Sequence, residues 1–281
     1  MIQDASQYKG WRILVTRPQA QAQAWIAHLQ ARGFSAEAVN LLAIVPVTDV
    51  DAVQAIKNCV MNLDNYAKVI FVSQNAVEQG MNWIDRYWPQ LPINVSFLAV
   101  GATTAKLLAS YGVAVEDLAV ASAGSMTSES LLQAASLQAP LDEKILIMRG
   151  QGGRGHIAET LRQRGAKVDY CELYQRELPT AAVAQLRTWL HRYFAQLAPS
   201  VSPRDILSVH SGESLQNLQQ LMAELATELK SEQREHVFDI PLLVPSERVA
   251  QSAQLMGWQK VIVAENATDA AMTQALEHYC T

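Results

Sequence analysis

The stretch of sequence that decides the fold is residues 145–179, ILIMRGQGGRGHIAETLRQRGAKVDYCELYQRELP. It opens with an apolar run at 145–148, which predicts a buried strand, and continues through a glycine-rich loop, GQGGRG. Apolar residues at helical spacing follow, and Gly165 comes after two arginines, which is typical of the end of a helix. Residues 168–178 alternate loosely enough to form a second strand. The stretch therefore predicts a β-α-β unit whose helix start offers backbone amides to an anion.

The same design occurs a second time near the start of the chain. Residues 12–19, RILVTRPQ, align with residues 144–151, KILIMRGQ, at a separation of 132 positions, and Gly33 then falls on Gly165. Strands that alternate with helices in this way predict parallel sheets covered by helices on both faces. We therefore expect an α/β fold with two similar, flavodoxin-like parallel-sheet domains, related by internal duplication.

Composition limits the possible function classes. The 281 residues suffice for two domains, and with 49% hydrophobic and 17% charged residues there is ample material for two cores. The net charge of −5 argues against general nucleic-acid binding. No signal peptide or bilayer-length apolar run occurs, so we expect a cytoplasmic protein without a membrane partner. Cys59, Cys171 and Cys280 are scattered, which suits reduced thiols and provides no metal-binding spacing.

Candidate ligand-binding residues stand where the expected strands end. Parallel sheets bind ligands beyond the carboxyl ends of their strands, and we expect one ligand to lie between two such edges. The small or polar residues expected there are Ser73, Asn75, Gly101, Thr103, Ser211, Gly212 and Ser246.

Three interpretations of the glycine loop remain open. Its GxGxxG spacing, from Gly150 to Gly155, fits a nicotinamide or flavin dinucleotide site, and it also fits a tight turn without a ligand. The interpretation we favour is a carboxylate site, in which Arg149 acts beside the amides of Gly152 and Gly153. Arg17 is the equivalent of Arg149 in the first copy, although a structural salt bridge would explain it almost as well.

Catalytic side chains are few. No serine lies in GxSxG and no histidine has a local nucleophilic partner, so a hydrolase is not indicated. His210, at an expected strand end, could line a site or be an ordinary surface residue. Tyr174 departs from the internal symmetry, because Leu42 takes its place in the first copy. Its phenol could help a hydroxyl leave as water, or it could simply pack where the chain crosses between domains.

Taken together, the motifs resemble one family. RGQGGR and CELYQR, with ILVTRP, VSQNAV, VGATTA, HSGES, PSERVA and VAENAT in this order, are similar to uroporphyrinogen-III synthases from Trp11 to Leu276. The resemblance implies a cofactor-free, monomeric enzyme of tetrapyrrole biosynthesis, a cyclising hydro-lyase with a small-molecule tetrapyrrole substrate. It would expel the hydroxyl of hydroxymethylbilane as water and close uroporphyrinogen III with inversion of ring D. The alternatives are a two-lobed ligand-binding protein and an NAD(P)-dependent oxidoreductase.

The resemblance also implies residue roles and domain bounds. Tyr174 corresponds to a family tyrosine with a modest catalytic effect, and backbone amides and hydroxyls at the strand ends would contact the substrate. Ser246-Glu247-Arg248 departs from the family's GxTTA pattern, which puts a role for Arg248 in doubt. The implied domains are residues 1–40 plus 178–281, and residues 48–170. Residues 41–47 and 171–177 would connect them as a two-stranded hinge.

Overall fold

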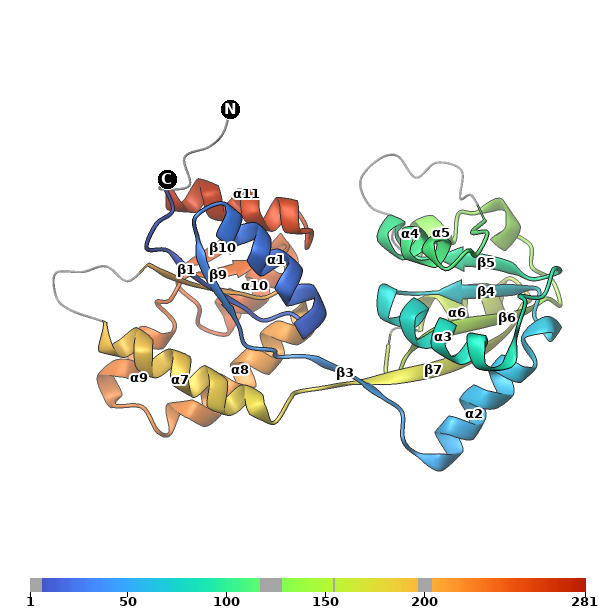
Figure 1. Ribbon diagram of the computed structural model, residues 1–281, viewed down its shortest axis with the longest axis horizontal. Coiled ribbons are helices and arrows are strands. Elements are labelled where there is room, and N and C mark those ends of the chain that lie inside the picture. Colours follow the sequence, from blue (N-terminus) through green and yellow to red (C-terminus); the bar gives the residue numbers. More distant parts are fainter. Residues whose placement is uncertain (1–6, 117–127, 154, 197–203) are drawn as a thin grey trace. The chain divides into compact units, whose positions relative to one another are not determined.

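The computed structural model describes residues 7–116, 128–153, 155–196 and 204–281, and Figure 1 shows its course. The chain divides into two compact units. Unit 1 contains residues 1–43 and 177–281, and unit 2 contains residues 44–176. The chain thus leaves unit 1 after one β-α-β segment and returns to it after completing unit 2.

Unit 1 is built on a five-stranded sheet with the order β10-β9-β8-β1-β2. Every neighbouring pair in this sheet is parallel. The strands are β1 (Arg12–Val15), β2 (Ser35–Ala38), β8 (Asp205–Ser208), β9 (Leu242–Val244) and β10 (Val261–Val263). The apolar residues of β1, β8 and β9 are buried on both faces, as the sequence pattern predicts.

Helices cover both faces of this sheet (Figure 1). Alternate strand residues point to opposite sides, so Leu14 packs in one core and Ile13 and Val15 in the other. The core with Leu14 is covered by α7 (Ala181–Ala195), α8 (Gly212–Ala226), α9 (Ser231–Val237) and α10 (Glu247–Leu255). The core with Ile13 is covered by α1 (Gln19–Ala31) and α11 (Asp269–Cys280).

Unit 2 has a second five-stranded sheet, with the order β3-β7-β6-β4-β5. The pairs from β7 to β5 are parallel. The strands are β3 (Ala43–Pro46), β4 (Lys68–Phe71), β5 (Ser96–Ala99), β6 (Lys144–Gly150) and β7 (Lys167–Glu177). Pro46 ends the edge strand, which is a position that proline tolerates.

This sheet too has a core on each face. One core is covered by α2 (Val50–Met61), α3 (Gln74–Tyr87) and α4 (Ala102–Ser110), together with the short 3-10 helix η1 (Leu63–Asn65). The other is covered by α5 (Ser128–Leu131), α6 (His156–Gln163) and the 3-10 helix η2 (Ala135–Leu137). Met148 and Ile147, adjacent on β6, point into the two different cores.

The two sheets share one strand order around their central β-α-β segments. In unit 1, β1 has β2 on one side and β8, then β9, on the other. In unit 2, β6 has β7 on one side and β4, then β5, on the other. The segments β1-α1-β2 and β6-α6-β7 are the stretches that align at a separation of 132 residues. The predicted α/β fold with two parallel sheets is confirmed.

Several details differ from the pattern-based expectations. The strand β2 and the helix α9 were not predicted, since SAEA and SEQREHV lack a clear apolar period. The polar residues at 128–130 are typical of a helix start, and a short helix, α5, is found at Ser128–Leu131. The apolar stretch at 118–121, whose composition predicts a weak strand, lies outside the described residues, as do the polar segment at 200–203 and Arg154 of the glycine loop.

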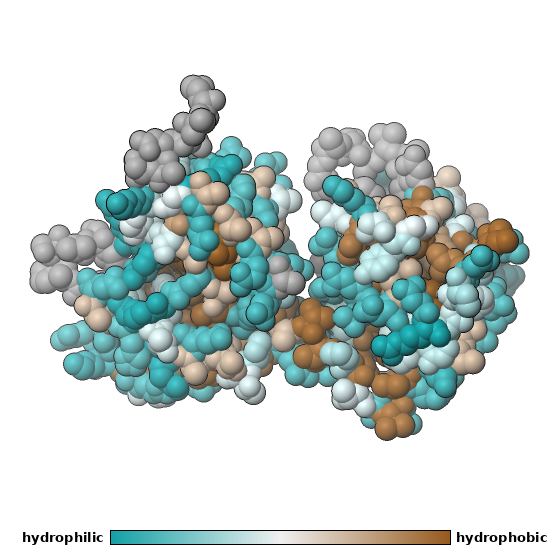
Figure 2. Space-filling view, in the orientation of Figure 1, coloured by the Kyte–Doolittle hydropathy of each residue, from teal (hydrophilic) through white to brown (hydrophobic). Residues whose placement is uncertain are grey.

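The described surface is mainly hydrophilic. Figure 2 shows polar residues over most of the visible face of each unit, with hydrophobic residues in scattered patches. The most exposed large apolar side chains are Val50, Ile93, Leu141 and Leu255. Among the described residues, no helix combines the length and the apolar character needed to cross a bilayer.

One glycine at the end of β6 yields a stability prediction. A Cβ added to Gly150 would overlap the Tyr174 ring, whereas one added to Gly212 meets no heavy atom within 4 Å. We expect Gly150→Ala to lower the free energy of unfolding by about 1–3 kcal/mol, because a buried ring must move. Urea denaturation measures this loss. The matched Gly212→Ala change should stay within about 0.5 kcal/mol of the wild type, and equal losses in both variants would contradict this packing.

Candidate functional site

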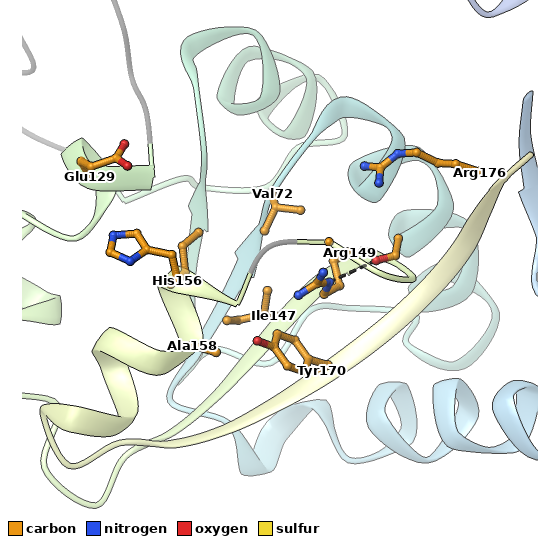
Figure 3. Close-up of a pocket in the computed structure, with 11 residues that line it drawn as sticks. Val72, Glu129, Ile147, Arg149, His156, Ala158, Tyr170 and Arg176 are labelled. Carbon is orange, nitrogen blue, oxygen red and sulfur yellow. Dashed lines mark hydrogen bonds between the residues drawn. The ribbon is translucent and has the colours of Figure 1, made fainter. Parts of the chain in front are cut away.

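A pocket of about 200 Å³ lies in unit 2 where β6 and β4 end (Figure 3). The neighbouring strand ends and the start of α6 meet here, which is the place where parallel sheets bind ligands. Apolar side chains, among them Val72 and Ile157, form part of its wall. Its ionisable lining residues are Glu129, Arg149, His156, Tyr170 and Arg176. Two arginines against one carboxylate favour an anionic ligand.

Arg149 is the central cation of this pocket. It follows the apolar core of β6 and is only 6% exposed. Its Cζ lies 4.7 Å from the centroid of the Tyr170 ring, and its Nε donates a hydrogen bond of 3.1 Å to the carbonyl oxygen of Gly150 (Figure 3). A carboxylate oxygen of Glu172 lies 3.9 Å from the same nitrogen. A planar guanidinium supported in this way can bind a carboxylate through two parallel hydrogen bonds.

Each of three glycines in the loop is explained by a different structural feature. A Cβ on Gly153 would overlap the guanidinium of Arg149, and Gly152 adopts a φ of +71°, which favours glycine. At Gly155 the carboxylate of Glu159 takes the space of a Cβ, in the first turn of α6. A negatively charged side chain in the first turn of α6 competes with an anionic ligand for the amides of this helix start.

Tyr174 owes its orientation to an irregularity in β7. Arg149 pairs with Glu172 but Gly150 pairs with Tyr174, so Leu173 is an extra residue in the ladder. As a result Tyr174 packs in the core of α2 and α3, whereas Tyr170 packs toward α6. Tyr174 is fully buried beside Gly150.

The Tyr174 hydroxyl has a defined partner. It shares a hydrogen bond of 3.0 Å with the Oγ of Ser73, which also accepts the N–H of Ala76 at 3.1 Å as the N-cap of α3. Ser73 is only partly buried. The phenol is therefore connected to the carboxyl edge of the sheet through a helix-capping hydroxyl.

The corresponding edge of unit 1 is arranged differently. Arg17, which aligns with Arg149, forms an ion pair with Asp269 and a hydrogen bond to the carbonyl oxygen of Ala267. Trp25 aligns with Ile157, and His210 precedes the N-cap of α8 as Val72 precedes that of α3. The rings of Trp25 and His210 meet edge to face at 4.8 Å. In unit 1, aromatic side chains thus occupy the positions that correspond to pocket-lining residues of unit 2.

His210 is held neutral by this environment. Neither of its ring nitrogens is accessible to solvent or has a hydrogen-bond partner in the described residues. Burial, and secondly the charge of Arg17, hold the pKa of His210 well below its ordinary value.

The remaining predicted residues lie at strand ends outside the pocket. Ser211 caps α8 by accepting the N–H of Ser214 at 3.0 Å, and Gly212 begins that helix. Gly101, with a φ of +91°, precedes α4. Asn75 and Thr103 lie in the first turns of α3 and α4, and Ser246 precedes α10. Of the predicted residues, Arg149 and Gly153 line the pocket, and Gly152 lies in the same loop.

Sequence reasoning missed four of the ionisable lining residues: Glu129, His156, Tyr170 and Arg176. His156 had a usable signal, since it directly follows the glycine loop at the start of a helix. Tyr170 and Arg176 lie on the strand beside β6, and only the pairing of β6 with β7 brings them to Arg149. The described residues contain no cluster of three or more His, Cys, Asp or Glu that could hold a metal ion.

Comparison with known proteins identifies the family of the chain. A family model described as "Uroporphyrinogen-III synthase HemD" matches residues 23–274. The chain belongs to the uroporphyrinogen-III synthase family. The uroporphyrinogen-III synthase of Escherichia coli (strain K12) is 33% identical over 94% of this chain and 99% of that protein. The uroporphyrinogen-III synthase of Salmonella typhimurium (strain LT2) is 34% identical over 94% of this chain and 99% of that protein.

Solved uroporphyrinogen-III synthases have a similar fold. A mutant enzyme from the extremely thermophilic bacterium Thermus thermophilus matches with a TM-score of 0.59 at 16% identity, over 95% of this chain and 98% of that one. The Helicobacter pylori 26695 uroporphyrinogen-III synthetase matches with a TM-score of 0.54 at 12% identity, over 96% and 99%. At these identities the likeness concerns the fold alone.

The neutral state of His210 yields a prediction of pH dependence. Because its pKa is lowered in the folded chain, the unfolded chain takes up a proton that the folded one does not as the pH falls below about 6.5. We expect His210→Leu to reduce the loss of unfolding free energy between pH 7 and 5. The reduction should reach at most about 1.4 kcal/mol per pH unit. Denaturant titrations across this range measure it, and parallel curves for the two proteins would contradict it.

Proposed function

We propose that this protein is a uroporphyrinogen-III synthase that acts on hydroxymethylbilane. The observation that carries the proposal is the family match over residues 23–274, together with the buried guanidinium of Arg149 in a pocket at the carboxyl edge of the unit 2 sheet. The substrate carries acetate and propionate side chains, and a pocket with two arginines suits one such carboxylate. The reaction expels the terminal hydroxyl as water and closes the ring with inversion of ring D.

The residues of the pocket would act mainly by positioning. Closure of the linear substrate without inversion is chemically easy, so the enzyme must hold one conformation of the chain rather than supply a strong acid or base. We propose that Arg149 anchors a side-chain carboxylate, while hydroxyls and amides at the strand ends orient the pyrrole rings. Support comes from the burial of Arg149 and from its contact with Tyr170, which together limit the motion of the guanidinium.

We propose that Tyr174 assists departure of the hydroxyl together with Ser73. The support is their shared hydrogen bond and the partial exposure of Ser73, because Tyr174 itself is fully buried. A phenol and a hydroxyl that share a hydrogen bond are both uncharged. Such a pair can donate a hydrogen bond to the oxygen of the leaving group without bringing a charge into a site from which water is excluded.

The product isomer tests the proposed activity directly. Purified protein incubated with hydroxymethylbilane should yield mainly the type III isomer, whereas the uncatalysed reaction yields type I. Chromatography of the oxidised porphyrins separates the two isomers. A protein that binds the bilane but leaves only type I would refute the proposed function.

Removal of the shared hydrogen bond should slow the enzyme without abolishing it. Tyr174→Phe and Ser73→Ala each remove one partner, and a net hydrogen bond of about 1 kcal/mol corresponds to about a fivefold loss of rate. Turnover under saturating substrate measures this loss. Tyr193→Phe is the matched control, since that buried tyrosine lies on α7 of unit 1. An unchanged rate in Tyr174→Phe would remove the phenol from the mechanism.

A further inference from the structure

Two thiols lie together in unit 2, in the core between β7 and α2. Cys171 on β7 is 1% exposed, and Cys59 on α2 packs against the same core cluster while remaining partly exposed. The Sγ of Cys59 lies 3.8 Å from the carbonyl oxygen of Tyr170, the residue directly before Cys171. The two thiols are also close enough for each to shift the pKa of the other. Residues 112 positions apart in sequence are therefore within reach of one another.

The surroundings distinguish the two sulfur atoms. The hydrogen bond from Cys171, with a smaller contribution from the Tyr66 hydroxyl, lowers the pKa of Cys59 to about 7. Burial and Asp169 oppose this effect. Tyr66 is itself held in place by a hydrogen bond of 3.0 Å from its hydroxyl to Asp169. The hydrogen bond with Cys59 and burial raise the pKa of the Cys171 thiol. The more exposed sulfur is thus also the better nucleophile at neutral pH.

We propose that Cys59 and Cys171 form a thiol–disulfide exchange site that reacts with small-molecule disulfides of the glutathione type. The Cys59 thiolate attacks one sulfur of the disulfide, which forms a mixed disulfide and releases one small thiol. Cys171 then gives up its proton and attacks the Cys59 sulfur, which releases the second small thiol. Two protein thiols are oxidised to one disulfide, and the small-molecule disulfide is reduced to two thiols.

The disulfide would connect helix α2 with strand β7. Helix α2 follows β3 directly, and β7 carries Tyr170, whose ring supports Arg149. Sulfur atoms in a disulfide lie about 2.05 Å apart, far closer than the sulfur atoms of two unbonded thiols. Oxidation therefore draws α2 toward β7 at the residue next to Tyr170. This inference does not depend on the proposed activity, because its test measures the oxidation of thiols and not the conversion of the bilane.

The third cysteine offers a matched control. Cys280 ends α11 in unit 1, and burial raises its pKa to about 12, so it should not compete in the exchange. The full chain is incubated with oxidised glutathione and its intact mass and disulfide-linked peptides are determined. We expect a product lighter by two hydrogens, with Cys59 linked to Cys171, in the wild type and in Cys280→Ser alike.

Single variants separate the two steps. Cys171→Ser should stop at the glutathione adduct on Cys59, and Cys59→Ser should form neither the adduct nor the bridge. The proposal is overturned if the wild type retains glutathione without closing the bridge, or if it forms no linked peptide between these two residues. It is equally overturned if the linked peptide contains Cys280. If either variant fails to fold, peptide mapping of the wild type alone tests whether Cys59 is linked to Cys171.

Discussion

The burial of one cation, Arg149, is the constraint on which the site in unit 2 depends. A guanidinium removed from water must find compensating partners, and here they are the Tyr170 ring, the Gly150 carbonyl and Glu172. The same side chain explains the adjacent loop, since a Cβ at Gly153 would overlap it. Within the glycine-rich sequence that resembles a dinucleotide fingerprint, Gly153 therefore makes room for an arginine side chain.

Near this cation, strand β7 places two tyrosines on opposite faces of its sheet. Before its extra residue, Leu173, it offers Tyr170 to the pocket, and after it Tyr174 packs in the opposite core. The bulge thereby separates a tyrosine that supports Arg149 from one that is bonded to Ser73. A strand of strict alternation would have placed both rings on one face. The local irregularity thus gives one short segment two chemical roles.

The two units show how one architecture can hold different sites. Their central strands have the same neighbours, yet Arg17 is engaged by Asp269 whereas Arg149 lines a pocket. Trp25 and His210 are larger than the Ile157 and Val72 that border that pocket, and they pack against each other. The interpretation of Arg17 as a structural ion pair, left open by its sequence, agrees with these contacts.

The sequence by itself determined the segment β6-α6-β7, the first strand and helix of its repeat, the parallel sheets with helices on both faces and the family. These features are local or depend on motif order, so apolar period and glycine position are enough to predict them. Only the tertiary structure decided that Tyr174 is buried, that Tyr170 and Arg176 join Arg149, and that Cys59 meets Cys171. Strand register, bulges and packing between distant segments arise from the whole core, and no local period encodes them.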